Sequence, residues 1–258
     1  MQHNTILEEI YSRNELIWGK EAQKHLFGKH VIVFGLGGVG SYAAEALARS
    51  GIGKFTLIDF DCVTPSNINR QLLATIPDIG KPKTELMKAR LESINPHIQT
   101  NIIQDFYTET LNTIFEGEKV DFVVDAIDTL KYKIDLICSC KARNIPVITS
   151  MGAGNRLDPT KLYLADVSEV RPHGCSFIKN VLSRLKSRGI TEGLPVVTST
   201  EKPFNLEKKD FTENITNGHG ETIEIRKFIP GSTPFVPPVA GYFMASYIIR
   251  TFIKQVNK

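Results

Sequence analysis

The sequence is poor in cysteine, and the few cysteines do not form the patterns that disulfide or zinc sites require. Four cysteines are scattered over 258 residues, and no two of them are spaced as a CxxC pair. So few and scattered cysteines exclude a disulfide framework, and without CxxC pairs a four-cysteine zinc site is excluded as well. We therefore expect a protein of a reduced, cytoplasmic compartment.

Long hydrophobic runs are also missing. The first 20 residues contain acidic side chains and no apolar core, which is unlike a secretory signal peptide. The longest late apolar run, residues 239–253, is interrupted by Arg250 and is too short to cross a bilayer. We expect neither a signal peptide nor a membrane span.

Charge of one sign is not in excess. The chain has 31 basic and 28 acidic residues, a formal net charge of +3, so overall charge gives no argument for nucleic-acid binding. Apolar residues at 41% and charged residues at 23% are typical of a folded globular chain. A case for nucleic acid must therefore come from local patches.

The sequence does contain an alternation of short apolar runs and helical segments. The predicted strands are 30–34, 55–58, 99–104, 120–124, 147–149, 162–167 and 196–199. The predicted helices are 41–50, 83–94, 108–115, 130–143, 177–188 and 237–253. This alternation predicts an α/β fold with a Rossmann-like, doubly wound, mostly parallel sheet and a C-terminal strand and helix extension. We expect the polar stretch 202–226 to be a flexible loop or hairpin.

A glycine-rich turn follows the first predicted strand. The stretch GLGGVG places Gly35, Gly37 and Gly40 between that strand and a helix, where glycines let the backbone approach a phosphate. Asp59 ends the next strand, 19 residues after Gly40, where a carboxylate can accept hydrogen bonds from ribose hydroxyls. These features predict a nucleotide site, and they fit ATP and NAD equally.

Charged residues further along the chain favour ATP. Attack at the α-phosphorus of a triphosphate builds negative charge on the leaving pyrophosphate, and Arg70 and Lys83 follow the Asp59 strand in places suited to stabilise it. Asp128 follows the strand VDFVVD, at the sheet edge where ligands bind, and suits a Mg²⁺ ion on the phosphates. A dinucleotide would leave all three without a role.

The order and spacing of these motifs resemble a known superfamily. The chain reads G-x-G-G-x-G, D-x-D-x-V-x-x-S-N-x-x-R-Q, G-x-P-K and D-x-x-D, which is similar to the ThiF/MoeB/ubiquitin-activating superfamily. Longer words, among them SRNELIWGKE, SMGAGNRLDPT and FVPPVAGYFMASYIIR, resemble the branch of tRNA threonylcarbamoyladenosine dehydratases and cover nearly the whole chain.

The resemblance implies a homodimer that uses ATP and Mg²⁺ to adenylate the carboxylate of threonylcarbamoyladenosine in tRNA, followed by ring closure and release of AMP. It would make residues 1–160 the adenylation half and residues 161–258 the part that completes the sheet and faces tRNA. Arg13 would reach the γ-phosphate across the dimer interface, and Asp128 would bind Mg²⁺. The other implied ATP-binding residues are Gly35, Gly37, Gly38, Gly40, Asp59, Asp61, Ser66, Asn67, Arg70, Lys83 and Thr129. The branch also implies sulfur-transfer partners such as a cysteine desulfurase.

Ring closure within one substrate needs no protein thioester. None of the cysteines lies in a motif that marks a nucleophile, and we expect Cys62 to be a buried, inert thiol. His173 and Cys175 are two residues apart on a predicted loop, a spacing at which a catalytic Cys–His pair is not expected.

A run of cations offers a place for tRNA. Residues 171–188 contain five basic side chains and no acidic one, namely Arg171, Lys179, Arg184, Lys186 and Arg188. Such a patch could neutralise RNA phosphates, although a charge run on a helix is more often a solvated face. The resemblance favours the interpretation as a tRNA patch.

Three alternatives stay open. An adenylyltransferase for a ubiquitin-like sulfur carrier would share the ATP residues, but such relatives commonly carry CxxC pairs. An NAD-dependent oxidoreductase would leave the later charges unused. A non-catalytic RNA-binding or scaffold protein would have no need of the ATP residues.

Overall fold

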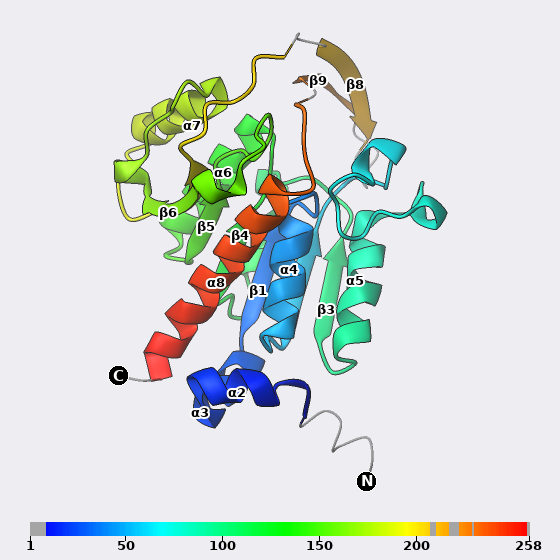
Figure 1. Ribbon diagram of the computed structural model, residues 1–258, viewed down its shortest axis with the longest axis vertical. Helices are drawn as coiled ribbons and strands as arrows, with labels where there is room; N and C mark the ends of the chain where they lie inside the picture. The colour runs from blue at the N-terminus through cyan, green and yellow to red at the C-terminus, as the bar shows by residue number, and fades with distance from the viewer. Residues whose placement is uncertain (1–8, 207–209, 217–221, 229, 257–258) are drawn as a thin grey trace.

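A seven-stranded sheet forms the centre of the molecule (Figure 1). The computed structural model describes residues 9–206, 210–216, 222–228 and 230–256. The strands are β1 (His30–Phe34), β2 (Lys54–Ile58), β3 (Gln99–Ile103), β4 (Phe122–Asp125), β5 (Val147–Ser150), β6 (Leu162–Asp166) and β7 (Pro195–Ser199). Their order is β3-β2-β1-β4-β5-β7-β6, and only β6 pairs antiparallel within this sheet. The predicted doubly wound, mostly parallel sheet is confirmed.

Helices cover both faces of the sheet. They are α2 (Ser12–Trp18), α3 (Lys20–Phe27), α4 (Gly40–Arg49), α5 (Lys83–Ile94), α6 (Leu130–Ala142), α7 (Ser176–Ser187) and α8 (Val236–Val256). Helices α4, α5 and α8 contribute to one hydrophobic core, whereas α6 and α7 contribute to the other. No helix in the part of the chain that the structure describes is long and apolar enough to cross a membrane.

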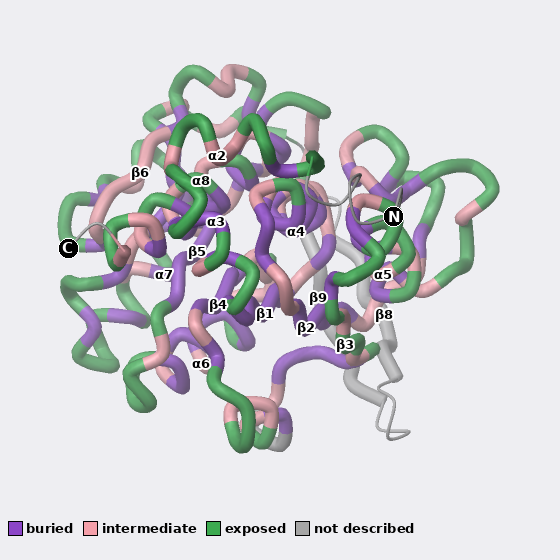
Figure 2. Tube along the Cα trace, turned by 90° about the horizontal axis from the view of Figure 1, so that it is seen from below, coloured by how far each residue is buried: buried purple, intermediate pink, exposed green. Residues whose placement is uncertain are grey.

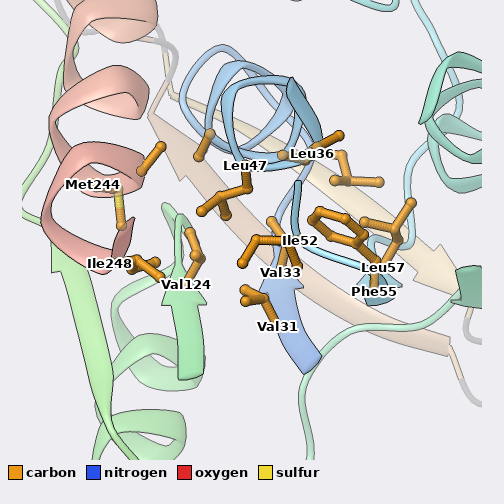
Figure 3. Close-up of a cluster of buried hydrophobic side chains, with 14 of the residues drawn as sticks. Val31, Val33, Leu36, Leu47, Ile52, Phe55, Leu57, Val124, Met244 and Ile248 are labelled. Atoms are coloured by element: carbon orange, nitrogen blue, oxygen red, sulfur yellow. The ribbon is translucent and has the colours of Figure 1, made fainter. Parts of the chain in front are cut away.

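Strand β1 shows why two cores form. All five of its residues are buried, and alternate side chains point to opposite faces of the sheet. Val31 and Val33 pack in the core with α4 and α8, where Figure 3 also shows Met244 of α8. Ile32 and Phe34 pack in the other core. A continuous apolar run is therefore what a central parallel strand requires, and Figure 2 shows β1 buried in the middle of the molecule.

Some predicted boundaries and element types differ from the structure. The predicted stretch 202–226 contains an antiparallel hairpin of β8 (Asp210–Thr216) and β9 (Thr222–Phe228), which extends two residues beyond it, while residues 202–206 form no strand. A hairpin was one of the two forms predicted. The predicted helix at 108–115 is a 3₁₀ helix, Glu109–Phe115. The predicted strand at 120–124 begins at Phe122, because β4 pairs with β1 only from that residue onward.

The two edges of the sheet are occupied differently. The carboxyl ends of the parallel strands lie at one edge, and the turns that follow β1, β2 and β4 meet there. Helices α2 and α3 lie at the opposite edge, near the start of β1 (Figure 1). In parallel α/β sheets ligands bind at the carboxyl edge, so this is where the site is sought.

Candidate functional site

The turn from β1 into α4 is built for close approach. Gly35 has φ +85°, and a Cβ there would lie 2.8 Å from the carbonyl oxygen of Ala126. A Cβ on Gly40 would lie 1.7 Å from the Gly35 carbonyl oxygen, so no side chain fits at that position. The turn holds Gly37 and leads into the N-terminus of α4, where backbone N–H groups have no partner within the helix. Such a terminus is suited to bind phosphate.

Asp59 ties this turn to the end of β2. Its side chain is 7% exposed, with one oxygen accepting from the N–H of Leu36 at 2.6 Å and the other from the N–H of Asp61 at 2.8 Å. Burial raises the pKa of the Asp59 carboxyl; the Lys83 ammonium opposes this shift and the charge of Asp61 adds to it. Asp59, the residue predicted to bind ribose, thus also holds the glycine turn against the end of β2.

Lys83 is held beside two carboxylates. Its Nζ lies 2.7 Å from Asp61 and 4.0 Å from Asp59, and its side chain is only 4% exposed. Backbone pairing across the loop sets this position, because the Lys83 N–H donates to the Asp61 carbonyl and Cys62 forms a bridge with Pro82. Burial alone would lower the pKa of Lys83, but the charges of Asp59 and Asp61 outweigh it and raise that pKa. Lys83 is a fixed cation at the carboxyl edge.

The segment between Asp61 and Lys83 brings Arg70 to the glycine turn. A short 3₁₀ helix, Pro65–Asn67, begins at a capping box in which Asn67 accepts from the N–H of Thr64 at 3.1 Å. Arg70 Nη1 donates to the carbonyl of Ser66 at 2.9 Å, so its guanidinium folds back over this turn. A Cβ on Gly38 would lie 3.2 Å from Arg70 Cγ. Arg70 therefore sits beside the glycine turn, and its hydrogen bond to Ser66 links the 3₁₀ helix to it.

Asp128 lies after the end of β4, at the same edge of the sheet as Arg70 and Lys83. It is exposed, and Thr129, the residue before α6, donates its hydroxyl to Asp128 at 3.3 Å. Burial lowers the pKa of Arg70 and the charge of Asp128 opposes this, while Asp128 also helps to raise the pKa of Lys83. The charge of Asp128, after β4, thus acts on Arg70 and on Lys83, which both follow β2.

The donor set fits a Mg²⁺ ion only if the ligand supplies most of the coordination. Among the described residues no group of three or more His, Cys, Asp or Glu side chains could hold a metal. Mg²⁺ is usually bound by one or two carboxylates together with substrate phosphates, and Asp128 is an exposed carboxylate at this edge. The site fits a metal that arrives with a nucleotide.

Arg13 lies away from this group within the chain. It is an exposed residue of α2, and this helix packs on the far end of α4, where Tyr11 donates to Ala48 and Asn14 to Arg49. The glycine turn lies at the other end of α4. Arg13 could therefore reach a site of this kind only in a second chain.

One of the cysteines, Cys62, is less buried than the sequence predicts. Cys62 is half-buried rather than buried, because it lies in the loop that pairs with Pro82 at the protein surface. Cys175 is buried while His173 is exposed, so the two side chains face different environments.

The predicted basic patch divides between two places. Lys179, Arg184 and Lys186 are exposed on α7, and Arg188 follows that helix, whereas Arg171 precedes it on a loop. Arg184 and Arg188 face α6, where they line a groove together with Lys131. Lys131 was not among the predicted residues.

Another residue that sequence analysis missed is Lys133. Its side chain is fully buried, and its Nζ lies 2.6 Å from Asp125 and 2.9 Å from the hydroxyl of Thr149. Asp125 also accepts from the N–H of Ile127, and so holds the start of the turn that leads to Asp128. The local signal in the sequence, an acid at the end of an apolar strand and a lysine one turn into the next helix, does not by itself indicate that the two are buried and paired.

Known proteins resemble the chain over nearly its full length. The model of the ThiF family matches residues 11–255. The tRNA threonylcarbamoyladenosine dehydratase of Bacillus subtilis (strain 168) is 42% identical over 247 residues, 96% of each chain. A crystal structure of the E. coli tRNA N6-threonylcarbamoyladenosine dehydratase with ATP has a TM-score of 0.82 and 29% identity over 96% of each chain. The same E. coli enzyme with AMP also has a TM-score of 0.82, at 30% identity over 95% of this chain and 94% of that one.

Proposed function

Because the chain belongs to the ThiF family, we propose that it transfers AMP from ATP to a carboxylate, namely that of threonylcarbamoyladenosine in tRNA. The observation that carries the proposal is the placement of Arg70 against the glycine turn, with the charge of Asp128 acting on both Arg70 and the buried Lys83. The similar E. coli enzyme was crystallised with ATP, the substrate of such a transfer, and with AMP, which the subsequent ring closure would release.

The positions of the residues support the following roles. The glycines of the turn, Gly35, Gly37, Gly38 and Gly40, let the backbone come close to the phosphates. The Gly35 N–H donates to the Ile58 carbonyl at 2.8 Å, so the N–H groups offered to phosphate are those from Gly37 onward, and Asp59 faces the ribose. Asn67, Arg70 and Lys83 bind phosphate oxygens, with Asp61, Ser66 and Thr129 forming the surrounding wall. Asp128 would hold the Mg²⁺ that comes with ATP, and the ion would neutralise phosphate charge.

The reaction has two steps. A carboxylate oxygen attacks the α-phosphorus, the bond to pyrophosphate breaks, and Arg70 and Lys83 stabilise the charge on the leaving group. A nucleophile in the same substrate side chain then attacks the acyl carbon, AMP leaves, and a five-membered ring closes with net loss of water. Proximity within one molecule accelerates this second step.

We also propose that the active form is a homodimer in which Arg13 serves the partner's site. Leu16 and Ile17 on α2 are 85% and 82% exposed, beside a groove of about 500 Å³ lined mainly by apolar side chains of α2, α4 and α8. An exposed apolar surface of this kind is typical of an interface. A cysteine desulfurase partner stays a prediction of the resemblance.

The dimer proposal is tested by mixing two inactive variants, Arg13→Ala and Arg70→Ala. If Arg13 acts in the partner's site, a mixed dimer has one complete site, and a re-equilibrated mixture should regain about a quarter of wild-type activity. A mixture that stays inactive although mixed dimers are seen by native mass spectrometry would contradict the role of Arg13.

The central test is ATP consumption by the purified protein with tRNA that carries or lacks the threonylcarbamoyl group. We expect AMP and pyrophosphate only with the modified tRNA, and a product nucleoside lighter by one water by mass spectrometry. Arg70→Ala should abolish AMP formation and spare tRNA binding. AMP formation that ignores tRNA and requires a ubiquitin-like carrier protein would instead establish the sulfur-carrier alternative.

A further inference from the structure

Two grooves of similar size differ in chemistry. The groove beside α2 is lined mainly by apolar side chains. The second, of about 520 Å³, lies between α6 and α7, and its lining residues are Lys131, Ile134, Asp135, Arg184, Ser187 and Arg188. We call this second one the α6–α7 groove.

The α6–α7 groove carries an excess of positive charge. Lys131, Arg184 and Arg188 are exposed, and Asp135 is the one acid of the lining, so the formal charge is three minus one, or +2. Asp135 lies 4.0 Å from Arg188, at the limit of an ion pair, and it is 28% exposed. Because Ile134 is buried, the rim presents almost only hydrogen-bonding groups. Such a surface suits a polyanion better than a protein side chain.

The groove begins close to the proposed ATP site. Thr129 precedes the first turn of α6, and Lys131 lies on that turn, only three residues after Asp128. At 1.5 Å per residue, the helix rises about 7.5 Å from Leu130, its first residue, to Asp135. That distance corresponds to about two stacked nucleotides at 3.4 Å each. A strand of RNA whose modified base enters the site would therefore pass its neighbouring phosphates over these cations.

We propose that the α6–α7 groove binds the phosphate backbone of the tRNA next to the modified nucleotide. The inference rests on the proposed function, since tRNA is the substrate assumed. It replaces the broad patch predicted from the sequence by three cations, of which Lys131 comes from a different helix. Lys179, Lys186 and Arg171 lie outside the groove lining and are not part of the contact.

The test removes these three charges and compares the loss with a matched control. The groove variant is Lys131→Gln/Arg184→Gln/Arg188→Gln. The control, Lys20→Gln/Lys24→Gln/Lys254→Gln, removes three exposed charges from α3 and the end of α8, at the opposite edge of the sheet. Binding of fluorescent modified tRNA is measured by anisotropy from 50 to 300 mM salt, and ATP affinity is measured in parallel.

We expect the groove variant to bind tRNA about tenfold or more weakly, with a slope of log K against log salt shallower by about 2 to 3. The control should change tRNA affinity less than about twofold, and both variants should keep wild-type ATP affinity. Should the triple variant fold poorly, each single substitution is expected to reduce the slope by about 1.

A groove variant that equals the control in affinity and slope would overturn the inference, while wild-type dehydration of tRNA would still support the proposed function. If the wild-type protein adenylates a carrier protein and binds no tRNA, the proposed function and the groove assignment both fail.

Discussion

Two lysine–aspartate pairs follow the strands on either side of β1, and they differ in burial. Lys83 lies 2.7 Å from Asp61 after β2, and Lys133 lies 2.6 Å from Asp125 at the end of β4. Both side chains of the Lys133–Asp125 pair are 0% exposed. In the other pair the Asp61 side chain is 36% exposed, so this pair is in contact with solvent at the carboxyl edge of the sheet.

The difference in burial indicates that one pair is available to bind a ligand, whereas the other stabilises the protein around the site. We call Lys83 with Asp61 the open pair and Lys133 with Asp125 the sealed pair. In the proposed site the open pair offers its cation to a phosphate, whereas the sealed pair has both side chains fully buried and no ligand reaches it. Its partners are the Thr149 hydroxyl and, through Asp125, the backbone of Ile127. We therefore expect the open pair to control catalysis and the sealed pair to control stability.

Cysteine reactivity should give the largest contrast. Burial, assisted by the charge of Asp125, raises the pKa of Cys140 to about 12, so at pH 8 only about 1 in 10⁴ of these thiols is a thiolate. Cys62, next to Asp61, is half-buried. Iodoacetamide should label Cys62 in the native protein at least about 10³-fold faster than Cys140. Peptide mass spectrometry measures both labelling rates. Equal rates without denaturant would show that Cys140, and with it the neighbouring Lys133–Asp125 pair, is accessible to solvent.

Lys133→Met should be the more destabilising of the two lysine substitutions. It leaves Asp125 charged and buried without a cation, which costs about 3–5 kcal/mol of unfolding free energy. Urea denaturation measures the loss, with Lys83→Met as the comparison, expected to lose about 1–2 kcal/mol because Asp61 is partly solvated. Adding Asp125→Asn to Lys133→Met should restore part of the stability. If Lys133→Met lost less unfolding free energy than Lys83→Met, the expected difference between the buried and the partly exposed pair would be contradicted.

Lys83→Met should instead reduce catalysis. Losing one preorganised cation at the leaving group lowers AMP formation about 10²–10³-fold, or about 2.7–4 kcal/mol in activation free energy. The folded variant is assayed for AMP at saturating ATP, and Lys88→Met on the same helix is the control, since Lys88 lies 3.9 Å from Glu92 in a half-exposed pair. Unchanged AMP formation would remove Lys83 from the proposed site.

Much of the fold was predictable because its patterns are local. The run HVIVF, the glycines after it and the charged ends of the strands indicate a parallel sheet and its ligand edge, and the structure confirms the sheet. That Arg70 and Lys83 after β2 lie at the same edge as Asp128 after β4 was predictable as well, since the carboxyl ends of parallel strands share an edge. Their role in a site stays a prediction.

The sealed pair and the groove could not be predicted in this way. Lys133 resembles any helix lysine until packing places it under β5, and Lys131 joins Arg184 only through the contact of α6 with α7. Both depend on tertiary packing between segments that are distant in sequence. The half-buried state of Cys62 depends likewise on its pairing with Pro82.

The smallest expected effect concerns the hydroxyl within the sealed pair. Thr149 donates to Asp125 at 2.6 Å and accepts from Lys133 at 2.9 Å, so Thr149→Val should cost about 1–3 kcal/mol. Thr198, on the adjacent strand β7, is an equally buried control whose hydroxyl has no hydrogen-bond partner among the described residues. Thr198→Val should leave the unfolding free energy unchanged or raise it, because an unpaired buried hydroxyl is replaced by a methyl group. Equal losses in urea denaturation would mean that the two sites respond to shape alone, whereas the expected difference shows that hydrogen bonding to Lys133 and Asp125 stabilises the support of the site.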